Sequence, residues 1–198
     1  TAVWLGARTV WAAMTSRPEF RVRPLALSLN EHPEWINCPR MELELRKELA
    51  ALPPAVSVFN NDLAQAVQRE LRGSPWVLNV TKVQRKLPDK LLVKAVFRKP
   101  AGLVLFGGQE CLLDEDGYWL PDEIFCRPPE WAGEQTPRIV DRALKQAPPR
   151  GRPWGGPGLA VGAKLTEFFR QNGLFQKLPL TTIDVTHVAR QGMEPDIV

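Results

Sequence analysis

The chain has 198 residues, which is enough for one large domain or two small ones with buried cores. Its apolar fraction of 44% and charged fraction of 24% are those of a soluble globular protein, so a disordered chain and a polytopic membrane protein are excluded. It contains 19 prolines, about twice the usual share. Because proline is poorly tolerated inside helices and central strands, many short elements are expected.

The charged residues lie in two blocks of opposite sign. The net charge is only +4, but residues 82–99 carry seven basic side chains and one acidic one, whereas residues 109–134 carry eight acidic side chains and one basic one. The basic block has Phe97 as its only aromatic residue, so it lacks the stacking surface on which single-stranded nucleic acid binds. A solvent-exposed strand face is therefore favoured over a nucleic-acid site.

Residues 1–14 are apolar and aromatic but too short to span a bilayer, and Arg8 interrupts them. We expect residues 1–19 to form either the end of a membrane helix or an amphipathic helix packed on the following domain. The chain starts with Thr1 instead of methionine, which indicates that an upstream segment has been removed.

The pattern of the next residues, 20–73, predicts a strand followed by two helices. Alternation and an apolar run at residues 20–29 indicate the strand. Residues 41–52 place apolar and charged side chains at helical spacing, and the prolines that follow end this helix. The second helix is predicted to start at Asn61 or Asp62 and to end before Gly73.

A hairpin follows these helices. Residues 76–86 and 91–98 predict two antiparallel strands joined by a Leu-Pro-Asp turn. In the first strand Lys82 stands where an apolar residue is expected, and one extra residue would restore the alternation. A β-bulge is therefore predicted near Lys82. The order to this point is strand, helix, helix, strand, strand, which describes a compact α+β unit.

The remainder of the chain predicts short strands and one long helix. Glycine pairs and an Asp-Gly pair separate the first strands, and a Pro- and Gly-rich stretch at residues 128–157 is read mostly as loop. The predicted elements are strands at 102–106, 110–114 and 118–120, an amphipathic helix at 159–171, and a strand at 180–188.

No recognisable catalytic or metal-binding motif emerges. His32 and His187 have no cysteine, serine or carboxylate at a known catalytic spacing. The three cysteines form no Cys-x-x-Cys pair, which argues against structural zinc, and buried free thiols are favoured over a disulfide between Cys111 and Cys126. We therefore predict no catalytic residue, no metal site and no cofactor.

Residues 75–100, PWVLNVTKVQRKLPDKLLVKAVFRKP, resemble the signature region of the FtsQ/DivIB bacterial cell-division proteins. That family has a Pro-Trp start, a strand, a turn with proline, a second strand and a charged residue shortly before a proline. An altered helix start at residues 59–71 and an Asp-x-x-Gly turn downstream extend the resemblance. The positions that carry it are Pro75, Trp76, Pro88, Arg98, Pro100, Asp114 and Gly117. The stretch between Trp76 and Pro88 is one residue longer than is usual in the family.

The resemblance implies an α+β fold. Residues 20–99 would form a POTRA-like β-α-α-β-β domain, and residues 100–198 a smaller antiparallel β-domain with one amphipathic helix, incomplete at its C-terminus. The resemblance also implies an inner-membrane (cell-membrane) protein with a single membrane helix and these domains on the extracytoplasmic side at the division septum. Such a protein is a scaffold of the divisome and not an enzyme. The implied partners are small coiled-coil division proteins of the FtsB and FtsL type, with no nucleic acid and no small-molecule substrate.

Partner binding is expected by β-strand addition, because an open sheet edge offers unpaired N–H and C=O groups. The family binds through its last strand, which this chain lacks, so the edge near residues 182–188 is either such a site or an edge left open by truncation. The residues assigned to it are Thr182, Ile183, Asp184, Val185 and Thr186. A proline at Val185 is expected to block this edge.

Two other functions remain as alternatives. The first is a POTRA module of an outer-membrane protein assembly or secretion component, which the single copy of the unit and the mixed tail disfavour. The second is a hydrolase acting on peptidoglycan, for which no motif is found.

Overall fold

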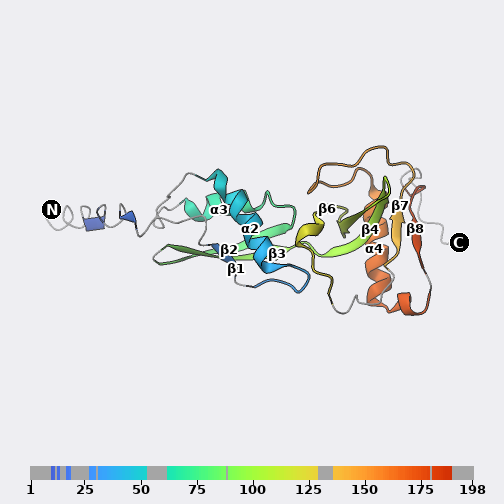
Figure 1. Ribbon diagram of the computed structural model, residues 1–198, viewed down its shortest axis with the longest axis horizontal. Coiled ribbons are helices and arrows are strands. Elements are labelled where there is room, and N and C mark those ends of the chain that lie inside the picture. Colours follow the sequence, from blue (N-terminus) through green and yellow to red (C-terminus); the bar gives the residue numbers. More distant parts are fainter. Residues whose placement is uncertain are drawn as a thin grey trace. The chain divides into compact units, whose positions relative to one another are not determined.

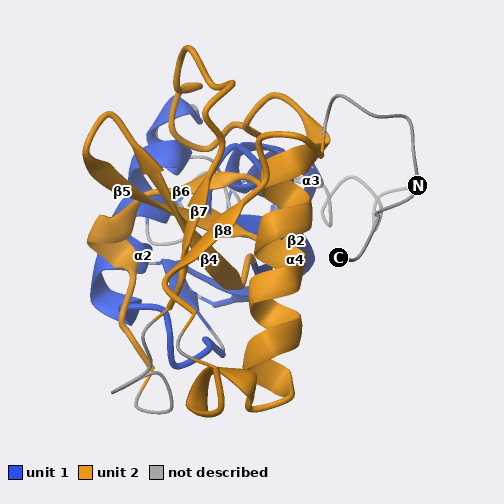
Figure 2. Cartoon of the chain, turned by 90° about the vertical axis from the view of Figure 1, so that its right-hand side faces the viewer, with its two compact units in different colours: residues 1–97 blue, residues 98–198 orange. Residues whose placement is uncertain are grey.

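The computed structural model describes residues 10–11, 13, 17–18, 27–29, 31–52, 62–87, 89–128, 136–178 and 180–188. The chain divides into two compact units, residues 1–97 and 98–198 (Figure 2). Each unit contains helices and a β-sheet, so the predicted α+β class is confirmed. Most of residues 1–19, as well as Pro88, lie outside the described residues. Among the helices that are described, none is both long enough and apolar enough to cross a membrane.

The first unit runs strand, helix, helix, strand, strand, in the order read from the sequence. Its elements are β1 (Leu27–Leu29), α2 (Cys38–Glu48) with a 3-10 turn at Leu49–Ala51, α3 (Leu63–Leu71), β2 (Val77–Lys86) and β3 (Lys90–Phe97) (Figure 1). The sheet has the strand order β1-β3-β2, with β1 parallel and β2 antiparallel to β3. Helix α2 packs on β1 and α3 packs on β2.

A side-chain cap explains the start of α2, and apolar spacing explains the packing of both helices. The side chain of Asn37 accepts a hydrogen bond from the Arg40 backbone N–H at 3.2 Å, so α2 begins at Cys38, three residues earlier than predicted. In α2, Met41 and Leu45 are buried four residues apart. In α3 the buried residues Leu63, Val67 and Leu71 repeat the same spacing, so each helix turns one apolar stripe to the core.

The predicted bulge in β2 is confirmed. The register between β2 and β3 shifts between Val80 and Lys82, which returns Val83 to the helix side opposite Val93. A second shift between Val77 and Asn79 was not predicted. It buries Val77 and leaves Leu78 50% exposed.

The second unit is built on a five-stranded sheet. Its elements are β4 (Pro100–Phe106), β5 (Gln109–Asp114), β6 (Trp119–Leu120), β7 (Arg138–Val140), α4 (Pro157–Gln171) and β8 (Thr182–Asp184). The strand order is β6-β5-β4-β7-β8, and α4 packs against β4 and β7 (Figure 2). The unit is not smaller than the first, since it covers residues 98–198 against 1–97.

The prediction of an antiparallel second domain holds only for β4, β5 and β6, because the sheet is mixed. β4 pairs with β7 in parallel, and β7 pairs with β8 in parallel. Parallel neighbours need a crossover connection, and α4 supplies it between β7 and β8. The sequence did not reveal this arrangement because β7 has only three residues and lies in the Pro-rich stretch read as loop.

Ile139 of β7 fills the space between β4 and α4, and two glycines make room for it. Ile139 is fully buried. A methyl group added at Gly102 of β4 would lie 2.7 Å from Ile139 Cδ1, and one added at Gly162 of α4 would lie 2.7 Å from Ile139 Cγ2. Both distances are too short for real atoms, so the sheet and helix approach this closely only because these residues lack a Cβ.

A double-mutant cycle tests this packing. Gly102→Ala is expected to lower the free energy of unfolding by about 1–3 kcal/mol through overpacking. Ile139→Val removes Cδ1 but keeps Cγ2, so it should relieve Gly102→Ala and leave Gly162→Ala unrelieved. Denaturant melts of the single and double variants measure the coupling. If the changes in the free energy of unfolding simply add when Ile139→Val is combined with either glycine variant, Ile139 is not the side chain that a Cβ at those glycines would overpack.

Candidate partner-binding edge

The edge strand β8 lies at one side of the five-stranded sheet. Within the described residues it pairs only with β7, in the register Arg138–Thr182, Ile139–Ile183 and Val140–Asp184. The two ends of the pairing are held by backbone hydrogen bonds from Arg138 N–H to the Thr181 carbonyl at 3.0 Å and from Val185 N–H to the Val140 carbonyl at 2.9 Å.

These bonds fix which backbone groups of β8 face away from β7. Backbone groups alternate between the two sides of a strand, and residues 181 and 185 point inward. Ile183 therefore also points inward, while the N–H and C=O groups of Thr182 and Asp184 point outward. The side chains of the same residues point to the two faces of the sheet: those of Ile183 and Val185 are buried, and those of Thr182 and Asp184 are exposed.

The expectation that a proline at Val185 would block the outer edge was wrong. The Val185 N–H is bonded to β7, so proline there would break the sheet itself. The sequence could not reveal this, because the direction of the backbone groups depends on the parallel register with β7.

Thr186 does not extend the edge but closes it with a turn. Its backbone N–H donates to Asp184 Oδ1 at 2.9 Å, and its hydroxyl donates to the same oxygen. The hydroxyl oxygen also accepts from the Arg142 N–H at 3.0 Å. These two bonds from Thr186, with smaller contributions from the charges of Arg142 and His187, lower the pKa of Asp184. Of the five predicted residues, Thr182, Ile183 and Asp184 thus form the edge strand, and Thr186 belongs to the polar turn that follows it.

Four of the seven residues that carry the family resemblance meet at the start of the second unit. Pro100 pairs with Asp114 across β4 and β5, and Gly117 has a φ of 79° in the turn after β5. Arg98 donates to Asp114 Oδ2 at 2.7 Å, and its guanidinium lies 3.6 Å from the centre of the Tyr118 ring. Asp114 is almost fully buried, so this pair is a structural anchor.

The other three residues of the resemblance belong to the first unit. Trp76 is fully buried in the turn between α3 and β2, and Pro75 precedes it half-buried. Pro88 lies outside the described residues. The six signature residues that the structure describes therefore maintain the fold, and none of them lies at the edge strand β8.

A second ion-pair cluster joins Lys99 to α4. Lys99 Nζ lies 2.5 Å from Glu167 Oε1, Gln171 donates to the same oxygen at 3.0 Å, and Arg170 donates to Oε2. Burial raises the pKa of Glu167, but the hydrogen bonds from Lys99 and Gln171 and the charges of Lys99 and Arg170 outweigh it, so the pKa lies below its ordinary value. Together with the bond between Arg98 and Asp114, these bonds tie residues 98 and 99 to the second unit.

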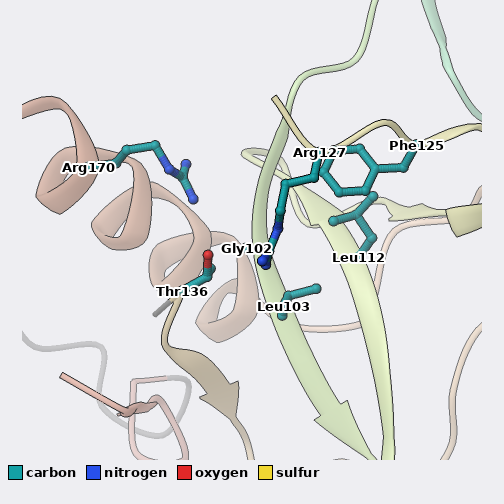
Figure 3. Close-up of a pocket in the computed structure, with 7 residues that line it drawn as sticks. All are labelled: Gly102, Leu103, Leu112, Phe125, Arg127, Thr136 and Arg170. Atoms are coloured by element: carbon teal, nitrogen blue, oxygen red, sulfur yellow. The ribbon is translucent and has the colours of Figure 1, made fainter. Parts of the chain in front are cut away.

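A small hollow lies between the sheet and the end of α4. Figure 3 shows the guanidinium groups of Arg127 and Arg170 directed toward it from opposite sides. Its enclosed volume is about 20 Å³, far below the roughly 300–1,000 Å³ of ordinary ligand pockets. Arg170 is already held by Glu167 and by the Ala101 carbonyl. The hollow therefore supports no assignment of a small-molecule site.

Metal chemistry finds no support in the described part of the chain, where no three His, Cys, Asp or Glu side chains gather around one point. Cys111 is buried, and Cys111 and Cys126 are free thiols. No family model matches the chain, and no curated protein matches it.

An apolar flank of α4 was not recognised from the sequence as a surface feature. Val161, Leu165 and Phe168 are 44%, 37% and 55% exposed, and their spacing places them on one side of the helix. The signal was present in the sequence, but the helix has two apolar sides and only the structure separates the buried one from the exposed one.

Proposed function

We propose that this chain is an extracytoplasmic scaffold module of the FtsQ/DivIB type, with a POTRA-like first unit, and that it binds a partner by strand addition at β8. The observation that carries the proposal is the outward direction of the N–H and C=O groups of Thr182 and Asp184 on a strand with one neighbour among the described residues. Such groups are the template for an added strand.

The apolar flank of α4 supports this position for the partner. Around α4, Thr166 lies beside Gly102 of β4, Gly162 lies against Ile139 of β7, and Gly158 lies against Val185 at the end of β8. Continuing around the helix in the same direction, the next residues are Leu165 and then Val161. A strand paired with β8 would therefore place alternate side chains under this flank and remove it from water.

The longer edge strand of the first unit, β2, is a weaker candidate. It contains two register shifts and carries several lysine and arginine side chains, features by which natural proteins protect an edge from pairing. β8 has a regular register with β7 and no basic residue. This difference favours a partner bound at β8 of the second unit. In the alternative function, a POTRA module of an outer-membrane assembly protein would guide added strands along the edge of the first unit, where β2 is protected against pairing.

The partner that this proposal implies is a small single-pass division protein of the FtsB or FtsL type. It would supply a short extended segment with alternating apolar side chains next to its coiled coil. Binding would take place on the extracytoplasmic side of the cell membrane at the septum, and it needs no cofactor and no small-molecule substrate.

Thr182→Pro is the variant that tests the edge. It removes an N–H that points away from β7, so the sheet should keep its bonds while an added strand loses a donor and meets the proline ring. We expect capture of the membrane partners during co-purification of the full-length protein to fall by about tenfold or more. Undiminished capture by a Thr182→Pro protein with an unchanged melting curve would reject β8 as the binding edge.

Val185→Pro is the matched control. Its N–H bonds to β7, so this variant should lose stability before it loses any partner-specific contact. If Val185→Pro lowers the melting temperature and Thr182→Pro leaves it unchanged, the N–H of residue 185 faces β7 and that of residue 182 faces away from it.

A further inference from the structure

The open face of the first sheet carries four lysines in two facing pairs. In the register of β2 and β3, Lys82 lies opposite Lys94, and Lys86 lies opposite Lys90. Residues directly opposite in an antiparallel pair project to the same face. All four side chains are exposed, while the residues between them along β3, Leu91 and Val93, are buried on the helix side.

Like charges placed opposite each other repel, so this arrangement does not serve the stability of the hairpin. Among the described residues, Glu31 is the carboxylate that pairs with this face, at 3.1 Å from Lys94 Nζ, and both side chains of that pair are largely exposed. The lysines therefore present an excess of positive charge to whatever lies in front of the sheet.

The same hairpin exposes aliphatic side chains and no aromatic one. Leu87, in the turn between Lys86 and Lys90, is 60% exposed, and Val96 is 44% exposed, whereas Phe97 is buried. Figure 1 shows the hairpin as a two-stranded ribbon whose turn lies at one end of the first unit. A leucine in a turn flanked by lysines combines an apolar contact with charge on both sides.

We propose that this face of the first unit, Lys82, Lys86, Leu87, Lys90 and Lys94, binds the surface of an anionic lipid bilayer. The lysines would contact lipid phosphates, and Leu87 would enter the boundary between headgroups and acyl chains. The lack of aromatic residues argues against single-stranded nucleic acid. This proposal does not depend on the edge strand β8, because it rests on the other unit and on a different kind of contact.

The experiment measures co-flotation of the full chain with vesicles. One vesicle contains about 30% phosphatidylglycerol in phosphatidylcholine, and the other contains phosphatidylcholine alone. The readout is the ratio of binding to anionic over neutral vesicles, because the apolar residues 1–14 can associate with either lipid. We expect a ratio of about ten or more at low salt and a fall toward one at about 0.5 M salt.

Two pairs of variants identify the surface. Lys86→Glu with Lys90→Glu should bring the ratio close to one, whereas Lys164→Glu with Lys177→Glu, the same change in charge on exposed residues of the second unit, should leave it within about twofold. Leu87→Ser should lower binding to anionic vesicles several-fold, and Leu43→Ser, at a similarly exposed leucine of α2, should not. Melting curves check that each variant folds.

Three results would overturn the proposal. The first is an equal fall of the binding ratio in the lysine-to-glutamate variants of the first and of the second unit, which would show that only the net charge of the chain matters. The second is a Leu87→Ser protein that binds like the unaltered chain. The third is binding of soluble polyglutamate or of a single-stranded oligonucleotide that competes with the vesicles at equal charge, which would identify an acidic polymer as the ligand.

Discussion

Replacing Trp76 with alanine is expected to lower the free energy of unfolding of the first unit by about 3–5 kcal/mol. Trp76 has no exposed surface and is the largest fully buried side chain of the described residues. It lies in the turn between α3 and β2, where the chain passes from the helix layer to the sheet. Removing it leaves a cavity that the turn cannot close, since Leu71 before it and Val77 after it are already buried.

Denaturant unfolding measures this effect, with Leu78→Ala as the control. Leu78 is two residues away and half exposed, so its truncation should cost less than about 1 kcal/mol. A Trp76→Ala melting curve that coincides with that of Leu78→Ala would contradict the role of Trp76 in the core.

Replacing Asp114 with alanine is expected to cost the second unit about 3–5 kcal/mol, because it breaks a buried ion pair and leaves one charge behind. The Asp114 carboxylate accepts from Arg98 at 2.7 Å, from the Tyr118 N–H at 2.7 Å and from the Asp116 N–H at 3.0 Å. Arg98 is held over the Tyr118 ring and its side chain is only 12% exposed, so it cannot turn to water without disturbing that contact.

Asp116→Ala is the matched control for this prediction. Its side chain is exposed on the same turn, so its removal should change stability by less than about 0.5 kcal/mol. Asp114→Asn should fall between the two, since the amide oxygen can still accept the backbone N–H groups but the charge is lost. Equal unfolding midpoints for Asp114→Ala and Asp116→Ala would show that the ion pair with Arg98 does not stabilise the unit.

Sequence periodicity predicted the first unit better than the second for physical reasons. A long hairpin displays its alternation over many residues, so the misplaced charge of Lys82 was enough to locate a bulge. β7 has three residues, too few for any period, and the packing of its Ile139 depends on two glycines in β4 and α4. Such a fit depends on atoms far apart in the sequence and leaves no local signal.

The local sequence pattern was equally insufficient at the candidate binding edge, β8. Residues 180–188 were predicted as one strand, but β8 covers only Thr182–Asp184, and a turn at residues 186–188 follows it. Which backbone groups face outward follows from pairing with β7, and the exposure of Leu165 follows from how α4 lies on the sheet. Both are tertiary properties, so the sequence indicated the segment but not its binding groups.

The α4 crossover also determines when during folding β8 can offer its edge. β4 and β5 meet through the two-residue turn at Gly107 and Gly108, which closes a short loop. β8 meets β7 only after the whole segment containing α4 has been brought back to the sheet, and closing a longer loop costs more chain entropy. The hairpin can thus form early, while β8 becomes available for pairing only near the end of folding. A newly made chain would then present the proposed binding edge only once α4 was in place beside it, which would limit premature association with the wrong strand.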